Sequence, residues 1–387
     1  MLKNTGLKNI CVFCDGYPTE DDPQFAFIRP VVCAMADLGI HCIVIAPQSI
    51  TRIILKKVKA RKTKWIDYTE KGNSIYIIQP YTITLSTLIK TYKLTELICR
   101  GSYFQNKINA DVLYGHFWKN GIRAASIAQR KGLPVIVASG EANIDSEIDY
   151  RYEEIHERLN QISGVICVST RNLDESKRLN LITEKMRETV LLNGYNEKAF
   201  FKIDRKVARK EIGIDEDLFI GIAVGEYSKR KGTERIIKAA HGVPELRLML
   251  IGDGDNLSDT RQVIVSGVIP HNKLVYYLNA ADFFILPTLA EGCCNAIIEA
   301  IACGLPVISS DLPFNRDILD ESNSILVDPT DITSIQEAIV RLYENIDLRK
   351  QLSYGSIQKA KSLTINQRTE KIIHFIEDVV LERDSNG

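Results

Sequence analysis

The sequence predicts an α/β fold made of two doubly wound, Rossmann-like parallel-sheet domains, and three observations lead to this prediction. Short apolar runs alternate with helical stretches along the chain, as parallel strands alternate with crossover helices. The runs form two series, and a strong turn signal, Asn193-Gly194, lies between them. The length of 387 residues is enough for two or three domains. We therefore place one domain on each side of residue 193.

The first series predicts the strands of a domain over residues 1–192. Each run is short and apolar and is bounded by polar or turn residues, as buried strands are. The six runs are Ile10–Cys14, Cys42–Ala46, Ile75–Ile78, Val112–Tyr114, Val135–Ala138 and Val165–Val168.

The second series predicts a domain over residues 193–365. Its runs are Phe219–Val224, Leu248–Ile251, Val263–Val265, Phe283–Leu286, Val307–Ser309 and Ile325–Val327. Beyond it, an apolar stripe that includes Ile372, Ile373 and Ile376 predicts an amphipathic helix. We expect this helix, over 366–382, to pack back on the first domain, and the tail over 382–387 to fray.

The charge of the chain is balanced overall but not along its length. Lys and Arg number 49, as do Asp and Glu, so the whole surface is not that of a nucleic-acid binder. Residues 1–190 hold 26 basic and 20 acidic residues, and the remainder holds 23 and 29, so the halves carry +6 and −6. Seven of the cations lie in residues 52–64, just before Trp65. A solvated loop and a dock for anionic lipid headgroups are the two interpretations of segment 52–65.

Cysteine usage and the chain's hydropathy predict a cytoplasmic protein. Nine cysteines are spread along the chain, four of them in the strand-like apolar runs, as reduced core residues are. Cys11 and Cys14 have redox-motif spacing, but they lie on a predicted strand and no second metal-ligand pair accompanies them. We expect neither a signal peptide nor a membrane span.

The densest functional signal lies in residues 280–311, which read as strand, loop, helix, turn and strand. Glu291 falls in the loop beyond the first strand, where open α/β sheets bind ligands. Gly292 allows close backbone approach just before a helix N-terminus that can meet an anion. Glu299 lies on an otherwise apolar face of that helix, and a buried carboxylate there needs hydrogen-bond donors from the protein or from a ligand.

The spacing of Glu291 and Glu299 within this string closely resembles the donor-site motif of the retaining glycosyltransferases of family 4. That resemblance implies the GT-B fold, in which two Rossmann-like domains face a central cleft. It implies that Glu299 hydrogen-bonds the ribose diol of a nucleotide sugar and that Glu291, a catalytic residue, lies beside the transferred sugar. The backbone amides that help to hold the sugar and its phosphates would be those of Gly292, Cys293, Cys294 and Asn295.

A second element is similar to the family's G-R-x(4)-K-G motif, whose Arg and Lys bind the donor diphosphate. Gly225 and Lys231 occupy their expected places, which implies donor-binding roles for both and a catalytic role for Lys231. The Arg position holds Glu226, and a carboxylate cannot bind a diphosphate. Three alternatives follow: Arg230 supplies the second cation, donor binding is weak, or the chain is a non-catalytic descendant.

The first half carries segments similar to the family's acceptor-domain motifs. His116 follows a predicted strand, and the resemblance implies contact with the donor sugar near the reacting centre. For Glu141 we expect a position near the cleft and assign no further role. Residues 17–29 correspond to a loop that in many members carries Gly-Gly against the donor phosphates, but here that loop carries bulky aromatic residues, so we expect it to contact the acceptor. Arg29 is either a partner for an acceptor phosphate or one half of a surface ion pair.

Residues Gly252-Asp-Gly-Asp255 invite two other interpretations. A D-x-D motif after a strand holds a divalent ion in the other glycosyltransferase fold, GT-A. The position in the second domain argues against a metal, since family 4 members carry a similar turn there without one. A dinucleotide site is not expected either, because Leu257 stands where the third glycine would be.

We therefore expect a retaining, metal-independent transfer of a hexosyl unit from a nucleoside diphosphate sugar, with a UDP-sugar as the first candidate, to a hydroxyl of a saccharide acceptor. No further cofactor and no nucleic-acid partner are expected. By analogy the setting is bacterial surface polysaccharide assembly, with an acceptor on a polyprenyl diphosphate and peripheral contact of segment 52–65 with the inner face of the membrane. A sugar-nucleotide epimerase, a non-catalytic partner subunit and an NAD-dependent oxidoreductase are the alternatives.

Overall fold

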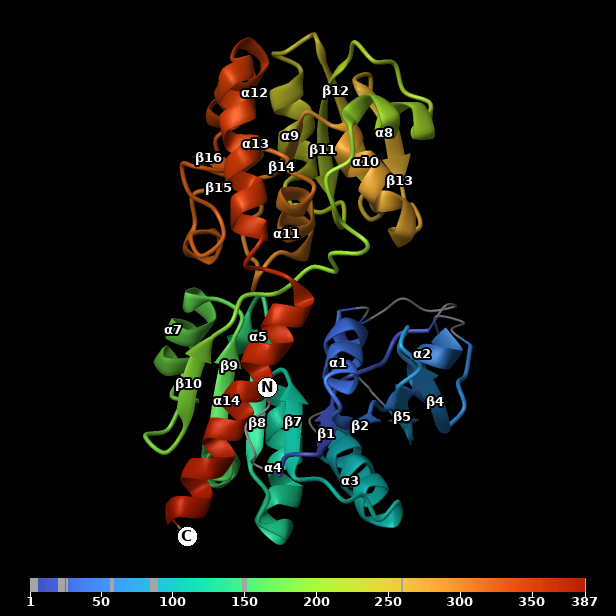
Figure 1. Cartoon of the computed structure of the whole chain (residues 1–387), viewed down its shortest axis with the longest axis vertical. Helices are drawn as coiled ribbons and strands as arrows, with labels where there is room; N and C mark the ends of the chain where they lie inside the picture. The colour runs from blue at the N-terminus through green and yellow to red at the C-terminus, as the bar shows by residue number, and fades with distance from the viewer. Residues whose placement is uncertain are drawn as a thin grey trace. The chain divides into compact units, whose positions relative to one another are not determined.

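The computed structural model describes residues 6–19, 25, 27–55, 59–83, 90–147, 152–258 and 260–386. The chain forms two compact units (Figure 1). Unit 1 comprises Met1–Leu191 and Arg368–Gly387, and unit 2 comprises Leu192–Gln367. The chain therefore leaves unit 1, builds unit 2 and returns to unit 1 for its last helix.

Unit 1 is built on an eight-stranded sheet in the order β10-β9-β8-β7-β1-β2-β5-β4. Every neighbouring pair is parallel except β4 with β5 at the edge. The strands are β1 (Asn9–Phe13), β2 (His41–Ile45), β4 (Lys64–Tyr68), β5 (Ser74–Ile78), β7 (Val112–His116), β8 (Val135–Ser139), β9 (Gly164–Cys167) and β10 (Arg187–Val190), and a separate parallel pair is β3 (Gln48–Ser49) with β6 (Tyr81–Thr82).

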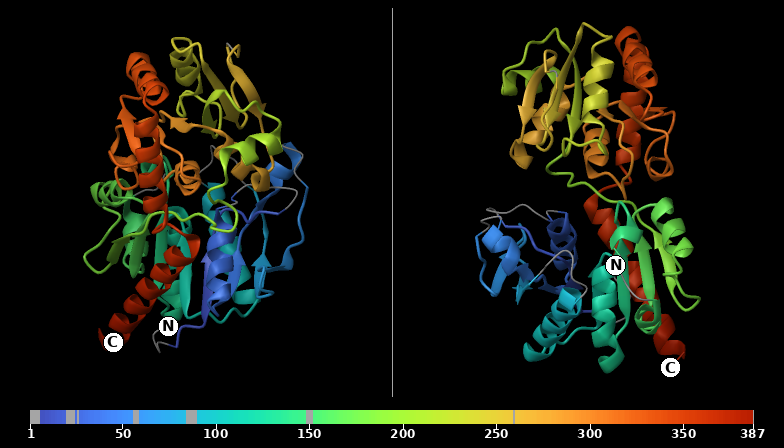
Figure 2. Two further views of the ribbon diagram at one scale, coloured as in Figure 1. Left: turned by 45° about the horizontal axis from the view of Figure 1, so that its top comes forward. Right: turned by 180° about the vertical axis from the view of Figure 1, so that it is seen from behind.

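Helices cover both faces of this sheet (Figure 2). Helix α4 contacts β7 and β8 and packs against α3 and α6, and its buried side chains include Trp118 and Ile122. The helices are α1 (Ile28–Asp37), α2 (Ile50–Leu55), α3 (Lys90–Gln105), α4 (Trp118–Lys131), α5 (Ile144–Glu147), α6 (Tyr152–Leu159), α7 (Thr170–Arg178) and α14 (Ile365–Asn386).

Unit 2 holds a six-stranded, fully parallel sheet in the order β13-β12-β11-β14-β15-β16. Helices α9 and α12 pack together over its core, and α8 pairs with α10 and α11 with α13. The elements are α8 (Arg205–Ile212), β11 (Phe219–Val224), α9 (Thr233–Ala240), β12 (Leu246–Ile251), β13 (Val263–Gly267), η1 (His271–Lys273), α10 (Leu274–Ala280), β14 (Phe283–Leu286), α11 (Asn295–Ala302), β15 (Val307–Ser310), η2 (Pro313–Asn315), β16 (Ser324–Val327), α12 (Ile332–Glu344) and α13 (Ile346–Ala360).

The strand orders confirm the predicted fold class of two doubly wound, Rossmann-like α/β domains. In unit 2, numbering the strands from β11 gives the order 3-2-1-4-5-6, in which the winding reverses between β11 and β14. In unit 1 the reversal falls between β1 and β7. Open α/β sheets bind ligands outside the carboxyl ends of the strands at such switch points. The loops that follow these four strands are therefore where functional side chains are expected.

Three features differ from the sequence-based expectations. Strand β4 was not predicted, and its first two residues are the end of the basic segment 52–65. Its side chains alternate between exposed and half-buried, and the exposed ones include Lys64 and Tyr68, so the strand has no apolar run in the sequence. Helix α2 also begins that segment, so the segment is not simply a loop; residues 56–58 lie outside the described ranges. The tail does not fray where predicted, because α14 continues to Asn386 and Arg187 pairs with Glu382 at 2.8 Å.

All nine cysteines are free, and eight of them are buried. Cys11 and Cys14 belong to the core of unit 1, and burial raises the pKa of the Cys14 thiol well above its usual range. Their spacing therefore reflects core packing. None of the described helices combines the length and apolar character that crossing a bilayer requires.

Candidate functional site

Two glycine-containing loops approach each other at the switch point of unit 2. Gly225 follows β11 with φ 144°, and Gly252 follows β12 with φ 148°. A Cβ at Gly252 would lie 1.9 Å from the Gly225 carbonyl oxygen, and one at Gly254 would lie 2.4 Å from the carbonyl oxygen of Tyr227. The G-D-G turn is thus required for backbone packing: Tyr227 donates to the Asp253 carbonyl at 2.7 Å and accepts from the Asp255 amide at 2.8 Å.

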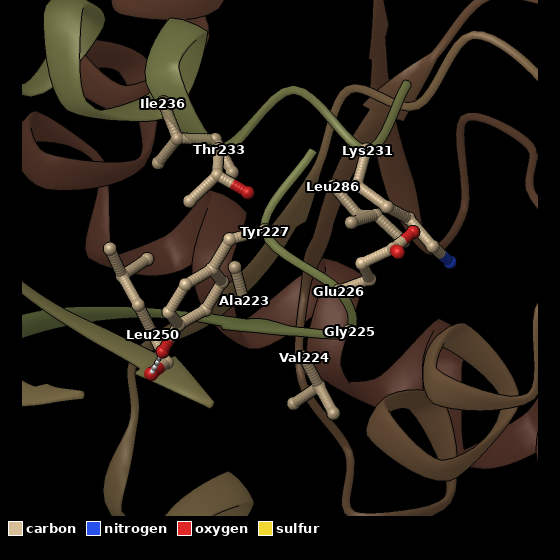
Figure 3. Close-up of a pocket in the computed structure, with 10 residues that line it drawn as sticks. All are labelled: Ala223, Val224, Gly225, Glu226, Tyr227, Lys231, Thr233, Ile236, Leu250 and Leu286. Carbon is tan, nitrogen blue, oxygen red and sulfur yellow. Dashed lines mark hydrogen bonds between the residues drawn. The ribbon is translucent and has the colours of Figure 1, made fainter. Parts of the chain in front are cut away.

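Beside Gly225 lies a small pocket whose wall includes Glu226, Lys231 and Thr233 (Figure 3). In Figure 3 the Tyr227 ring turns away from Lys231 toward Leu250, and the Tyr227 hydroxyl donates a hydrogen bond to the Leu250 carbonyl oxygen. Gly225 is suited to this place because a Cβ there would meet the Lys231 side chain at 3.4 Å. The absence of a side chain at residue 225 leaves the lysine head accessible from this loop.

Arg230, Lys231 and Glu291 come together although 60 residues of chain separate the two loops. The Glu291 Oε1 atom lies 2.7 Å from a terminal nitrogen of Arg230 and 2.7 Å from the Lys231 Nζ atom. The Thr288 hydroxyl also donates to Oε1, at 3.0 Å. Arg230 further donates to the Ala290 carbonyl, and its other terminal nitrogen lies 3.9 Å from Glu226. The structure thus puts Arg230 beside the lysine that the sequence assigns to the donor phosphates.

The electrostatics of this cluster keep Lys231 charged. Burial disfavours the ammonium, but the charge of Cys294, once that thiol ionises above neutral pH, and the ion pair with the Glu291 carboxylate outweigh burial, so the pKa of Lys231 is raised. Burial raises the pKa of the neighbouring Cys294 thiol to about 11, so this cysteine is neutral near pH 7. The cluster presents two cations, Arg230 and Lys231, facing the carboxylates of Glu226 and Glu291.

Glu299 lies on α11 with its side chain 16% exposed, and its Oε1 atom is 3.3 Å from Nε2 of His271. The hydrogen bond to Glu299 raises the pKa of His271, whose ring also packs edge-on against Phe200 at 5.2 Å. The carboxylate is therefore partly accessible and partly paired. His271 was not identified from the sequence, because a lone histidine after a strand carries no signal of its partner.

The loop before α11 places Gly292, Cys293 and Cys294 in buried positions and Asn295 at the helix start. Asn193, from the predicted domain joint, donates its side-chain amide to the Cys293 carbonyl at 3.1 Å and to Asn295 Oδ1 at 2.9 Å. The two units divide between Leu191 and Leu192, next to this turn signal, but the signal gave no hint that Asn193 braces the loop before α11.

At the switch point of unit 1, His116 ends β7 inside an aromatic cluster. Its ring lies 4.6 Å from that of Phe117 and 5.2 Å from that of Phe27, centroid to centroid. Burial, reinforced by Arg368, lowers the pKa of His116 to about 3, so the imidazole is neutral near pH 7. Its Nδ1 atom is buried without a hydrogen-bond partner among the described residues. An unsatisfied polar atom at such a place is a candidate contact for a ligand hydroxyl.

Phe117, between β7 and α4, has a strained backbone with φ 74° and ψ 155°. That region is essentially reserved for glycine and costs roughly 1–3 kcal/mol, and it occurs mostly at functional sites. The strained turn directs the chain from the strand end into α4. The predicted contact loop contributes to the same cluster: Phe25 and Phe27 lie 6.2 Å apart, whereas residues 20–24 and 26 lie outside the described ranges.

Glu141 supports this turn from inside the protein. Its Oε1 atom accepts from the Trp118 amide at 2.7 Å, and Oε2 accepts from the Gly140 amide and the Ser139 hydroxyl, each at 2.8 Å. The residue is 4% exposed, and burial raises the pKa of its carboxyl group. Its carboxylate is therefore directed at the first turn of α4, which makes Glu141 a candidate positioning residue.

Arg29 forms the ion pair that was one of its two interpretations. Its guanidinium donates to both oxygens of Asp67, at 2.7 and 3.1 Å, and to the Tyr68 carbonyl at 3.1 Å. Among the described residues, no group of three or more His, Cys, Asp and Glu side chains is arranged to hold a metal ion. Asp253 and Asp255 have exposed positions in the G-D-G turn.

Residues 204–359 match the family model described as Glycosyl transferases group 1. A protein of Bacillus subtilis (strain 168), whose name places it in teichuronic acid biosynthesis as a glycosyltransferase, is 25% identical over 360 residues, which cover 86% of this chain and 88% of that protein. UDP-Gal:α-D-GlcNAc-diphosphoundecaprenol α-1,3-galactosyltransferase of Escherichia coli is 24% identical over 77% of this chain and 81% of its own.

Solved structures with the same fold cover nearly the whole chain. Sucrose-phosphate synthase from Thermosynechococcus elongatus matches with a TM-score of 0.80 at 17% identity, over 97% of this chain and all of that one. HepE of Anabaena, solved with UDP and glucose, matches with a TM-score of 0.71 at 14% identity, over 96% of this chain and all of its own. These likenesses confirm the two-domain fold of GT-B glycosyltransferases.

Proposed function

We propose that this chain, whose residues 204–359 match the glycosyl transferases group 1 model, is a retaining family 4 enzyme that transfers a hexosyl unit from a nucleoside diphosphate sugar to a saccharide hydroxyl. The observation that carries this proposal is the convergence of Arg230, Lys231 and Glu291 at the switch point of unit 2. Two cations aimed at one point form the site that a diphosphate requires.

In this proposal the donor diphosphate binds Arg230 and Lys231 and takes the place of Glu291 as their partner. Glu291 is then released from the cations to contact the transferred sugar. Glu299 holds the ribose diol, and the amides at the start of α11 add their partial positive charge. Because Arg230 can supply the cation that Glu226 cannot, the departure at residue 226 is compatible with catalysis.

The main catalytic requirement is stabilisation of the leaving diphosphate, whose charge grows as the glycosidic bond breaks. Lys231 is suited to this because its raised pKa keeps it cationic. The acceptor hydroxyl attacks from the face that the diphosphate leaves, and the departing phosphate oxygen takes the proton. His116, neutral near pH 7, contacts the sugar as a hydrogen-bonding group and does not act as an acid. No metal ion and no further cofactor enter this scheme.

UDP-sugars are the first donor candidates, because the Escherichia coli relative is named for UDP-Gal and HepE was solved with UDP. The same relative is named for a diphosphoundecaprenol acceptor, which supports a polyprenyl-diphosphate-linked saccharide in bacterial surface polysaccharide assembly. We place such a chain at the cytoplasmic face of the membrane, with peripheral contact through segment 52–65.

A ligand-stabilisation screen with UDP, GDP, ADP and dTDP sugars tests the proposal. A ligand at 100 times its dissociation constant adds about 2.7 kcal/mol of stability, and we expect this for one nucleotide class with EDTA present. Glu299→Ala should weaken that nucleotide about tenfold, since a hydrogen bond to a charged group contributes about 1.5–3 kcal/mol. Glu245→Ala, an exposed change in the same unit, should leave it unaltered.

Other outcomes would select a different function. If no nucleotide sugar stabilises the protein and no transfer occurs, the chain is better explained as a non-catalytic partner subunit. Glu226 would then be the reason that the donor does not bind. Interconversion of the donor with no acceptor present would favour an epimerase. Activity that disappears in EDTA and returns with Mn²⁺ or Mg²⁺ would overturn the metal-independent scheme.

A further inference from the structure

Unit 1 contains a cavity of about 380 Å³ at its own switch point. It lies between Asp15 and Gly16 after β1, residues 47–49 after β2, and Phe117 and Lys119 at the start of α4. This volume falls in the range of ligand sites, about 300–1,000 Å³. The strained Phe117, next to His116, forms part of its wall. The cavity therefore lies next to the position of His116, which the proposed function places in contact with the transferred sugar.

Most of the charged side chains that line the cavity are cations. Five cations line it: Arg52, Lys59, Arg61, Lys119 and Arg123. Among the described lining residues Asp15 is the sole carboxylate, and it accepts from Arg123 at 2.9 Å and lies 3.5 Å from Lys119. Burial opposes its ionisation, but these two cations outweigh burial and lower the pKa of Asp15. Among the described lining residues, cations therefore outnumber carboxylates by five to one.

The wall that carries these cations is held by hydrogen bonds within the unit. The Gln48 side chain accepts from the Arg61 amide at 3.0 Å and donates to the Arg61 carbonyl at 3.1 Å. It also donates to the Gln79 carbonyl at 2.9 Å, and the Arg61 guanidinium donates to the Tyr17 carbonyl. Arg61 is therefore fixed in backbone and side chain, and a fixed cation loses less entropy when it binds an anion.

Apolar side chains complete the lining. Phe25, Ile53 and Phe117 border the same hollow as the cations. The Phe25 ring rests on Gly16 so closely that a Cβ at residue 16 would lie 2.5 Å from it. A ligand that suits this lining carries several negative charges beside an apolar or sugar-ring surface.

We propose that this cavity binds the phosphate or diphosphate group of a phosphorylated saccharide acceptor. The proposal rests on the proposed function, which places the donor diphosphate at Arg230 and Lys231 in unit 2, so that a second phosphate site calls for a second phosphate-bearing substrate. It replaces Arg29, which binds Asp67, as the contact for an acceptor phosphate. It also gives part of the basic segment 52–65 a role in binding a ligand inside unit 1.

Inorganic diphosphate, titrated calorimetrically into full-length protein saturated with UDP, probes the cavity. We expect one saturable site, weakened at least tenfold by Arg52→Gln and again by Arg61→Gln, as the loss of a hydrogen bond between charged groups implies. Lys62→Gln with Lys64→Gln removes two exposed cations from the same segment and should leave the site unchanged. No saturable binding, or equal weakening in this control pair, would overturn the proposal.

Transfer assays separate this proposal from the proposed function. The two acceptors to compare are a sugar 1-phosphate and the methyl glycoside of the same sugar. Arg52→Gln and Arg61→Gln should each raise KM for the phosphorylated acceptor at least tenfold. Both variants should leave KM for the donor, and hydrolysis of the donor by water, unchanged. Equal use of both acceptors would overturn the cavity's role while the transferase function stands. A wild-type protein that does not hydrolyse any donor would instead count against the proposed function.

A third assay arm identifies the source of the phosphate. Helix α2 lines the cavity with Arg52 and Ile53 and exposes Ile54 and Leu55, which are 69% and 75% accessible. If the phosphate belongs to a lipid, Ile54→Ser with Leu55→Ser should raise KM for a polyprenyl-diphosphate sugar in vesicles and not for the soluble sugar 1-phosphate. If the phosphate belongs to a soluble acceptor, neither KM should change.

Discussion

At the scale of single residues, the chemistry that we propose for unit 2 depends on one carboxylate and two cations. Arg230 and Lys231 both contact the same oxygen of Glu291. Lys231→Ala should lower kcat about 100- to 1,000-fold, which is typical of removing one group that stabilises a developing negative charge. Arg230→Ala should have an effect of the same order if Arg230 replaces the missing family arginine. Steady-state kinetics with Lys229→Ala, an exposed neighbour, as the control would check this.

Glu291 should act in opposite directions on binding and on rate. Because its carboxylate occupies both cations, Glu291→Gln should tighten free UDP at least tenfold, and because the transferred sugar loses its contact, kcat should fall. A charge-assisted hydrogen bond contributes about 1.5–3 kcal/mol, which sets the scale of both changes. Calorimetry and initial rates on one variant measure them. Weaker UDP binding would show that the ion pairs pre-organise the site and do not compete for it.

His116 should make unit 1 less stable in acid. Its pKa in the folded protein is about 3, below the usual 6.5, so as the pH falls below 6.5 the unfolded chain takes up a proton that the folded chain refuses. Between pH 7 and 5 this should remove about 2 kcal/mol of unfolding free energy. Urea unfolding of wild type and His116→Asn at both pH values isolates the difference. An identical loss in the two proteins would mean that His116 is protonated normally.

At the scale of elements, the strained turn between β7 and α4 depends on Glu141. Glu141→Ala leaves the buried amide of Trp118 and the part-buried amide of Gly140 without their acceptor, which should cost roughly 3 kcal/mol in unit 1. The same change should lower kcat but not UDP affinity, because we assign nucleotide binding to unit 2. Glu141→Gln should recover part of the lost stability and part of the lost kcat. Glu157→Ala on α6, where the residue is exposed, serves as the matched control. A variant that is destabilised but fully active would limit Glu141 to stability.

The elements that the sequence predicted are those with an unmixed apolar signal. The twelve predicted runs all became strands, and eleven of them are largely buried, whereas β13 is a half-exposed edge strand whose valines and isoleucine kept the apolar signal. Strand β4 was missed, because it is a half-exposed edge strand whose polar residues hide the pattern. The short pair β3 and β6 is too brief to give any periodicity.

The candidate site was predictable only where a motif named its residues. The spacing of Glu291 and Glu299 led to α11, but nothing in the sequence showed that Arg230 and Lys231 would pair with Glu291 across 60 residues. The charged lining of the cavity in unit 1 was hidden for the same reason. Arg52 and Arg61 stood out only as members of a basic segment, whereas Lys119 and Arg123 come from a helix far along the chain.

At the scale of the whole molecule, the two units differ in how the chain builds them. Unit 2 is continuous, whereas unit 1 needs α14 from the other end of the chain. Phe375 on α14 packs against Gly164 at the start of β9, where a Cβ would lie 3.0 Å from its ring. Ile372, Ile373 and Ile376 are fully buried. The return of the chain is thus part of the core of unit 1 (Figure 1).

Ending the chain at residue 367 should therefore unfold unit 1 and spare unit 2. Burying a large aliphatic side chain contributes about 1.5–3 kcal/mol, so losing three such residues removes roughly 5–9 kcal/mol, comparable with the whole stability of a domain. We expect calorimetry of the truncated chain to show a single transition that UDP raises. The control variant ends at residue 381. Among the described contacts it removes only the exposed ion pair between Arg187 and Glu382, which is worth about 0–1 kcal/mol. It should therefore keep the unfolding transitions of both units. A truncation at 367 that kept the transition of unit 1 would show that its sheet is stable without α14.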